Sequence, residues 1–115
     1  MHWIIALFLV LALSIPAPAQ QVTRSKVTLT TVSVGAASGA ALAANEDRNF
    51  LMLQNDHATQ VVYCTTGATA TLNNGIRVNA VGGTIIFSPI VPLGALVCIA
   101  TGATTPLLIT EGARQ

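Results

Sequence analysis

The stretch Val27-Thr28-Leu29-Thr30-Thr31-Val32-Ser33-Val34 decides the fold class, because it alternates apolar and hydroxyl-bearing side chains. Alternation with a period of two is typical of a β-strand that buries one face. The apolar phase slips between Leu29 and Val32, which predicts a β-bulge or a switch of face within the strand. We expect alternate side chains from Val27 onward to point into a shared interior.

The rest of the chain after residue 20 consists of short β-branched and apolar runs, with no window of sustained helical spacing. Residues 40–44 fit either a short edge strand or a turn of helix, and residues 50–54 are apolar enough for a central strand. Further strands are predicted at 61–64, 69–72, 76–78, 84–87, 95–100 and 107–110. Seven to eight short strands with frequent turn signals predict an all-β fold, either a small antiparallel β-sandwich or a jelly-roll-like barrel.

Turn-forming residues separate these strands. Asn73-Asn74-Gly75 predicts a tight hairpin between 69–72 and 76–78, because both central positions of a type I′ turn need positive φ. Gly82-Gly83 predicts a simple turn, since no helix start follows that would form a phosphate cradle. Pro89 and Pro92 predict a break in the strand pattern, because a central strand does not tolerate proline.

The residues before Gln20 form a separate unit. An apolar run over 3–15 precedes Pro16-Ala17-Pro18-Ala19, the layout of a secretory signal peptide cleaved between Ala19 and Gln20. No Lys or Arg precedes the run, so a retained apolar helix and a misplaced start codon stay open as alternatives. As a helix the run rises only about 20 Å, whereas spanning a membrane takes roughly twenty residues. The predicted units are 1–19, a signal peptide or hydrophobic N-terminal helix, and 20–115, a single β domain.

Charged residues are scarce. Five Lys and Arg stand against four Asp and Glu, so the net charge is +1 and only 8% of residues are charged. A soluble domain usually devotes about a quarter of its residues to charge. A near-neutral balance gives no electrostatic reason to expect nucleic acid or an anionic membrane as a partner. An uncharged surface is common on exported proteins and on subunits covered by their neighbours.

The chain has two cysteines, Cys64 and Cys98. In an oxidising compartment they can pair, closing a loop of about 34 residues for which the chain-entropy model assigns roughly 3–4 kcal/mol. The alternative is two buried free thiols that act as small apolar side chains. No zinc site is expected, because two Cys and His57, without C-x-x-C spacing, do not supply four ligands.

The polar residues that could take part in catalysis are better explained by structural roles. His57 and Asp56 are predicted as a solvent-facing turn pair, which is favoured over a general base. Ser33, Ser38 and Ser88 lack the strained elbow of a serine nucleophile. We therefore expect no enzyme, no catalytic residue, no cofactor and no metal site.

Two further groups of residues are assigned structural roles. The cluster Glu46-Asp47-Arg48 predicts a solvated turn in which Arg48 ties down a carboxylate, because adjacent carboxylates in a strand point to opposite faces. Phe50, Tyr63 and Phe87 lie within predicted strands and are expected in the core, with the Tyr63 hydroxyl at the rim as an alternative. Binding that depends on exposed aromatic platforms is disfavoured.

Several segments between about residue 42 and residue 111 follow one another in a set order: Asn45-Glu46-Asp47-Arg48-Asn49-Phe50-Leu51-Met52-Leu53-Gln54-Asn55, Val61-Val62-Tyr63, Gly67, Gly75-Ile76, Gly82-Gly83-Thr84-Ile85-Ile86-Phe87, Gly94-Ala95-Leu96 and Leu107-Leu108-Ile109-Thr110-Glu111. This order resembles that of small β-sandwich accessory proteins of tailed bacteriophages. In that group an Arg precedes an apolar strand ending in Gln-Asn, followed by a Tyr-bearing strand, a Gly-rich turn before another strand, and a late apolar strand ending in an acidic residue.

The resemblance implies a non-enzymatic virion role, such as capsid decoration, a head-fibre base or a tail accessory subunit, in a symmetric homo-oligomer. Its partners would be other copies and a virion lattice. The leader departs from this pattern, since tailed-phage structural proteins assemble in the cytoplasm. The alternative is a secreted or periplasmic β-sandwich module for binding or adhesion. We expect an exported or virion location, with membrane association only if the leader is retained.

Overall fold

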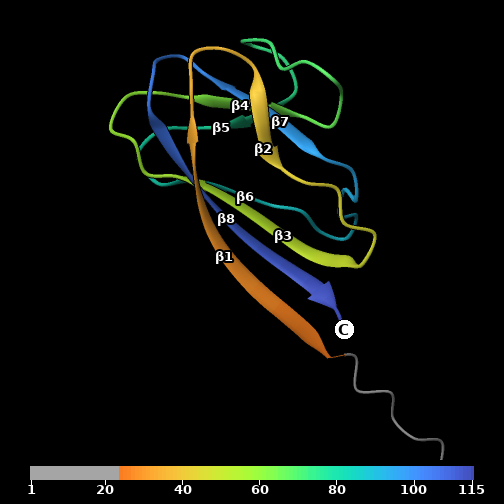
Figure 1. Ribbon diagram of the computed structural model, residues 1–115. Coiled ribbons are helices and arrows are strands. Elements are labelled where there is room, and N and C mark those ends of the chain that lie inside the picture. The colour runs from red at the N-terminus through yellow and green to blue at the C-terminus, as the bar shows by residue number, and fades with distance from the viewer. Residues whose placement is uncertain (1–23) are drawn as a thin grey trace, which may run out of the picture.

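The computed structural model describes residues 24–115, and the predicted leader with its cleavage between Ala19 and Gln20 lies outside them. The described chain forms two four-stranded antiparallel sheets and contains no helix. The prediction of an all-β, antiparallel fold is therefore confirmed. Figure 1 shows one sheet that contains all the long strands and one built of short strands packed across it, here called the large sheet and the small sheet.

The strands are drawn from distant parts of the chain. The large sheet has the order β1-β8-β3-β6, with β1 Ser25–Val34, β8 Thr105–Arg114, β3 Arg48–Asn55 and β6 Gly83–Ile86. The small sheet has the order β2-β7-β4-β5, with β2 Gly39–Leu42, β7 Leu96–Ala100, β4 Val62–Thr65 and β5 Ile76–Val78. Of the run at 40–44, residues 40–42 belong to the edge strand β2, which is one of the two alternatives left open for it. The apolar run at 50–54 lies centrally between β8 and β6, as expected.

The facing sides of the two sheets share one core. Within the large sheet, Leu53 lies opposite Ile109 and Asn55 opposite Leu107, so these buried side chains point the same way. The core cluster comprises Val34, Leu51, Leu53, Val62, Cys64, Val78, Leu96, Cys98, Ala100, Leu107 and Ile109. Because alternate residues face it, the core accounts for the period of two in the sequence.

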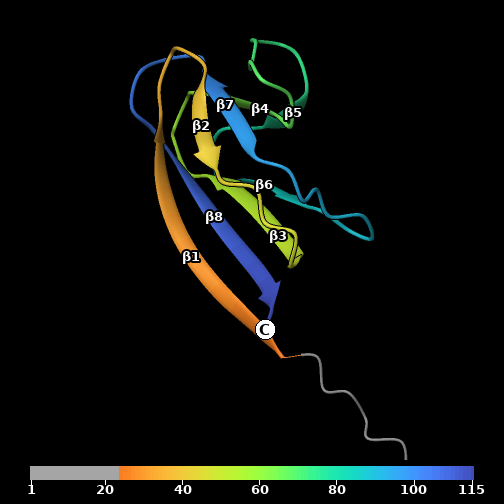
Figure 2. The same ribbon diagram turned by 45° about the vertical axis from the view of Figure 1, so that its right-hand side comes forward.

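The predicted bulge in β1 is wrong, and the alternative of a switch of face is what the structure has. β1 pairs with β8 without interruption, from Ser25 opposite Arg114 to Val34 opposite Thr105. Val32 lies opposite the buried Leu107 and points toward the small sheet, whereas Leu29 lies on the opposite face. The first half of β1 extends beyond the small sheet, as both Figure 1 and Figure 2 show.

The expectation that every alternate side chain from Val27 onward is buried is therefore wrong. Val27 is 61% and Leu29 76% exposed, and every residue from Ser25 to Thr31 is exposed. These apolar side chains point away from the small sheet. Even the residues that point toward it, such as Thr28, lie beyond its reach.

The predicted strand at residues 69–72 is also wrong. Cys64 of β4 pairs with Ile76 of β5, and the intervening chain is a long connection, in which the Ala70 N–H donates to the Ser38 hydroxyl (2.9 Å). Positive φ occurs at Asn73 (62°) and Gly75 (84°) and not at Asn74, so the turn is not type I′. A Cβ on Gly75 would lie 2.5 Å from the Cys64 carbonyl oxygen, which explains the glycine.

Candidate functional site

The large sheet has a second apolar face that points away from the small sheet, here called the outer face. One row crosses all four strands, because Leu29 lies opposite Thr110, Thr110 opposite Met52, and Met52 opposite Ile86. Leu29 is 76% and Ile86 57% exposed, and Met52 is half-buried. Adjacent rows add Val27, Gly112 and Phe50 on one side and Thr31, Leu108, Gln54 and Thr84 on the other.

Phe50 belongs to this face and not to the core, so its predicted core position is wrong. It is 38% exposed, while Tyr63 is buried and Phe87 is half-buried against the core. Phe50 lies opposite Gly112, and a Cβ on that glycine would come within 2.9 Å of the Phe50 Cβ. Glycine thus lets the aromatic ring approach β8 closely.

The side chains of the outer face are mostly apolar, and few of them carry reactive groups. A hollow over β1, β8 and β3 is lined by the outer-face residues Leu29, Thr31, Gln54, Leu108 and Thr110, together with Thr30 and Ile109 of the same strands. Hydroxyl and amide groups are the only polar side chains there, and none of the lining residues carries charge or a nucleophile that a neighbouring base activates. Such a surface is suited to contact with another surface and offers no acid–base pair.

Sequence analysis missed this face, although two signals pointed to it. The phase slip in β1 places apolar residues on both of its sides, and the run Phe50-Leu51-Met52-Leu53 is apolar on both sides of β3. A central strand is apolar on both faces when both are covered. Here one face of β3 is covered by the small sheet and the other is the outer face.

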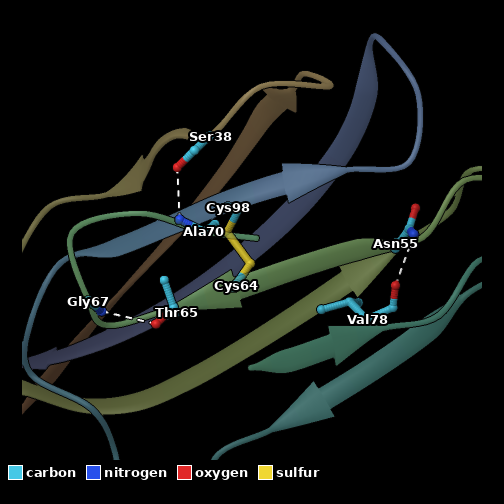
Figure 3. The surroundings of a disulfide bond; sticks show 8 residues. All are labelled: Ser38, Asn55, Cys64, Thr65, Gly67, Ala70, Val78 and Cys98. Carbon is cyan, nitrogen blue, oxygen red and sulfur yellow. Dashed lines mark hydrogen bonds between the residues drawn. A yellow bond between two sulfur atoms is a disulfide. The ribbon is translucent and has the colours of Figure 1, made fainter. Parts of the chain in front are cut away.

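Cys64 and Cys98 form a disulfide within the small sheet (S–S 2.06 Å). The two residues are direct neighbours on β4 and β7, with Cα atoms 4.1 Å apart, and both are buried in the core. Figure 3 shows the bridge between these two strands, near the Ser38–Ala70 hydrogen bond that ties down the long β4–β5 connection. Because both sulfur-bearing residues are buried, the bridge serves stability rather than thiol exchange.

Arg48 is buried, so the prediction of a solvated turn is wrong for this residue. Its Nε donates to Glu111 Oε2 (2.7 Å), its Nη2 to the Ala43 carbonyl (2.7 Å), and its Nη1 to the carbonyls of Pro92 and Gly94 (3.1 Å for Gly94). The carboxylate that Arg48 ties down is therefore on distant β8. The planar guanidinium joins two loops to the sheet at once.

A β-bulge explains why Arg48 faces inward. The β3–β8 register shifts between Arg48 opposite Ala113 and Phe50 opposite Gly112, which places an extra residue, Asn49, in β3. Without this shift Arg48 would share the outer face with Phe50 and Met52, because side chains alternate along a strand. The sequence cluster Glu46-Asp47-Arg48 thus splits: Glu46 and Asp47 are exposed in the turn, and Arg48 is buried.

His57 lies in a turn, as predicted, and its side chain has a structural role there. Its Nδ1 accepts hydrogen bonds from the N–H groups of Thr59 (3.1 Å) and Gln60 (2.9 Å). The fully buried Asn55 holds the same turn: its Oδ1 accepts from the His57 N–H (3.0 Å), and its Nδ2 donates to the carbonyls of Gln60 (2.8 Å) and Val78 (3.2 Å). Asn55 is a key residue that sequence analysis did not single out.

The remaining sequence candidates are not brought together. The Tyr63 hydroxyl donates to Asn73 Oδ1 (3.0 Å), and Arg77 lies over the Tyr63 ring at 5.8 Å. Within residues 24–115 no three His, Cys, Asp or Glu side chains gather as metal ligands do. In the same part of the chain no helix is long and apolar enough to cross a membrane.

Compared with protein-family models, with curated proteins and with solved structures, the chain gives no match in any of the three.

Proposed function

We propose that this protein is a non-enzymatic structural subunit that works by contact between protein surfaces, as a virion accessory or decoration protein of a tailed phage. The observation that carries the proposal is the outer face, an apolar surface that crosses four strands, has no charged side chain in the rows of Val27, Leu29 and Thr31, and leaves Leu29 and Ile86 more than half exposed. Monomeric soluble proteins rarely expose contiguous apolar patches of large size, and such patches mark interaction sites.

The rigidity of the fold supports a structural role. The disulfide fixes the small sheet, and Arg48 fixes the loops at 43–47 and 92–94 to β8 through four acceptor groups. We class the two packed sheets as a β-sandwich, with the small sheet as its second layer. A scaffold braced in this way holds the outer face in one shape, which lowers the entropy lost on binding.

The phage assignment rests on the segments that resemble accessory proteins. Two residues of that pattern, the Arg before the apolar strand and the acidic residue after the last one, are Arg48 and Glu111, which form an ion pair (2.7 Å). This contact supports reading the segments as one structural unit. The expected partners are other copies of the chain and a virion lattice.

The test is the protein composition of virions. Phage particles from the source strain, purified on a density gradient, reduced to open the Cys64–Cys98 bridge and digested with trypsin, are expected to yield the peptide Asn49–Arg77 at a fixed ratio to the major capsid protein. Treatment of intact particles with detergent is the control for loosely attached membrane protein. Absence of this peptide from virions, while it is present in the culture supernatant or periplasm, would contradict the virion assignment.

A secreted or periplasmic module for binding or adhesion is the second candidate, and the disulfide favours it, because disulfides persist in oxidising compartments. For this candidate the intact mass of the protein from the periplasm or medium is expected to correspond to a chain that begins at Gln20. Retention of residues 1–19 in that fraction would count against cleavage and favour an anchored form.

A further inference from the structure

The four sheet edges differ in how well they are protected. β2 and β6 have four residues each and β5 has three, with a register shift in β2 and the charged Arg77 in β5. β1 has ten residues, pairs with β8 without a bulge, and contains no Pro or Gly. Its one charge is Lys26. Proteins normally shorten, bulge or charge their edge strands to prevent pairing with another chain. β1 lacks all but one of these devices.

The hydrogen-bonding groups on the open side of β1 can be assigned. The Gln115 N–H donates to the Arg24 carbonyl (3.0 Å), in line with the register that places Ser25 opposite Arg114. Hydrogen-bonded and non-hydrogen-bonded residues alternate in an antiparallel pair, so the even-numbered residues of β1 bond to β8. The N–H and C=O groups of the odd-numbered residues Ser25, Val27, Leu29, Thr31 and Ser33 therefore point to the edge that no other strand of residues 24–115 covers.

We propose that β1 pairs with β1 of a second copy, antiparallel, about a two-fold axis at Leu29. Leu29 then lies opposite Leu29 of the second copy, Val27 opposite Thr31 and Ser25 opposite Ser33. The two large sheets become one continuous sheet of eight strands. The proposal deepens the proposed function, on which it rests for the expectation that copies meet, by naming the contact through which they do so.

Self-pairing fits this strand because the residues complement their own reverse order. The register at Leu29 uses every open N–H and C=O from Ser25 to Ser33, whereas a shift of either copy leaves some unpaired. The side chains of those same residues lie on the outer face, so the outer faces of the two copies join into one. Lys26 lies opposite Val32 of the second copy, so no like charges meet.

A cysteine at the two-fold axis tests this register directly. Both native cysteines are in the disulfide, so a third cysteine is the only free thiol. In the full chain, Leu29→Cys is expected to form a covalent dimer under mild oxidation, because residues in a hydrogen-bonded antiparallel pair have Cα atoms about 5.5 Å apart, within the range for disulfides. Ile86→Cys, equally on the outer face but on the opposite edge of the sheet, is the matched control and is expected to stay uncrosslinked.

The mass of the protein in solution, measured without engineered thiols, is a second test of the β1–β1 contact. Sedimentation of the unmodified protein is expected to show a dimer or a multiple of it, and Leu29→Pro is expected to halve the mass. The Leu29 N–H is not bonded to β8, so proline there removes a donor used only between copies, and an unchanged circular dichroism spectrum shows that the fold survives.

Three results would overturn the proposal: a monomeric unmodified protein, equal crosslinking of the two cysteine variants, or a folded Leu29→Pro variant of unchanged mass. A monomer would leave a strand of another protein as the partner of this edge. Unchanged mass in Leu29→Pro together with dissociation by Ile86→Lys would point to stacking of outer faces. The virion composition is a separate readout, so a phage subunit with another contact is distinguished from a protein that is no phage subunit.

Discussion

The two sheets differ in what they bury and in what they expose. In the small sheet the central strands β4 and β7 are joined by a buried disulfide, and the sheet has few exposed large apolar side chains in its strands. In the large sheet the outer face, which points away from the small sheet, leaves Val27, Leu29 and Ile86 exposed, and β1 also continues past the small sheet (Figure 2). A chain with few charges can thus stabilise one layer by an internal crosslink and keep the outer face of the other layer apolar.

The largest expected effect on stability is at Arg48, which braces the inner side of the large sheet. Arg48→Met leaves Glu111 without its ion-pair partner and three carbonyls without a donor, and loss of one partner of a buried pair costs about 3–5 kcal/mol. Urea unfolding followed by circular dichroism measures this loss. The control is Arg77→Met on the exposed side of β5, which is expected to lower the midpoint far less. Equal effects would show that Arg48 contributes no more than a surface charge.

Removal of the disulfide is expected to be next. The double variant Cys64→Ala, Cys98→Ala opens a loop of 34 residues between the paired positions, and the chain-entropy model gives a loss of about 3–4 kcal/mol. Under conditions where this variant stays folded, its sedimentation is expected to be unchanged, because the disulfide lies in the small sheet and the proposed contact between copies lies on the large sheet. The control is the unmodified protein unfolded under reducing conditions, whose unfolding midpoint is expected to equal that of the double variant. A loss of association in the double variant would contradict the division of roles between the sheets.

The sequence predicted the parts of the fold that depend on local pattern. Alternation in residues 27–34 and the apolar run at 50–54 correspond to β1 and β3, because period-two burial is a property of a strand by itself. The failures depend on distant partners. The pattern of residues 69–72 predicted a strand paired with its neighbours in sequence. In the structure β4 already has β5 on one side and β7 on the other, so residues 69–72 have no place beside β4.

The candidate site failed to appear in the sequence for a similar reason. Whether Leu29 and Phe50 are core residues depends on which face of the large sheet the small sheet covers, and the pattern of one strand does not contain that information. The burial of Arg48 likewise depends on a one-residue bulge at Asn49 and on an acceptor that is 63 residues away, at Glu111. Local pattern showed which residues alternate, and tertiary geometry decided which face is covered.

Asn55 tests the join between β3 and the small sheet, with an intermediate effect. Asn55→Leu removes the donor to the carbonyls of Gln60 and Val78 and the acceptor for the His57 N–H, and unpaired buried polar groups cost about 1–3 kcal/mol. Thermal unfolding measures the change. His57→Ala is the comparison variant and is expected to cost less, because its acceptor serves N–H groups of an exposed turn that water can reach. A larger loss of stability in His57→Ala would show that the His57 imidazole stabilises this turn more than the buried Asn55 amide does.

The smallest expected effect on stability is at the outer face, and there it separates folding from contact most cleanly. Leu29→Lys and Ile86→Lys replace exposed side chains that contribute nothing to the core, so each is expected to change the free energy of unfolding by no more than about 0.5 kcal/mol. Association is expected to respond differently, because a lysine at the two-fold axis places two like charges opposite each other and one at Ile86 does not. Sedimentation over a range of salt concentrations measures this, and the dimer of Leu29→Lys is expected to weaken at low salt and recover in part at high salt, since ions screen the repulsion. If Leu29→Lys instead unfolds the chain as strongly as Arg48→Met does, the outer face is part of the stabilising core and the contrast between the two sheets does not hold.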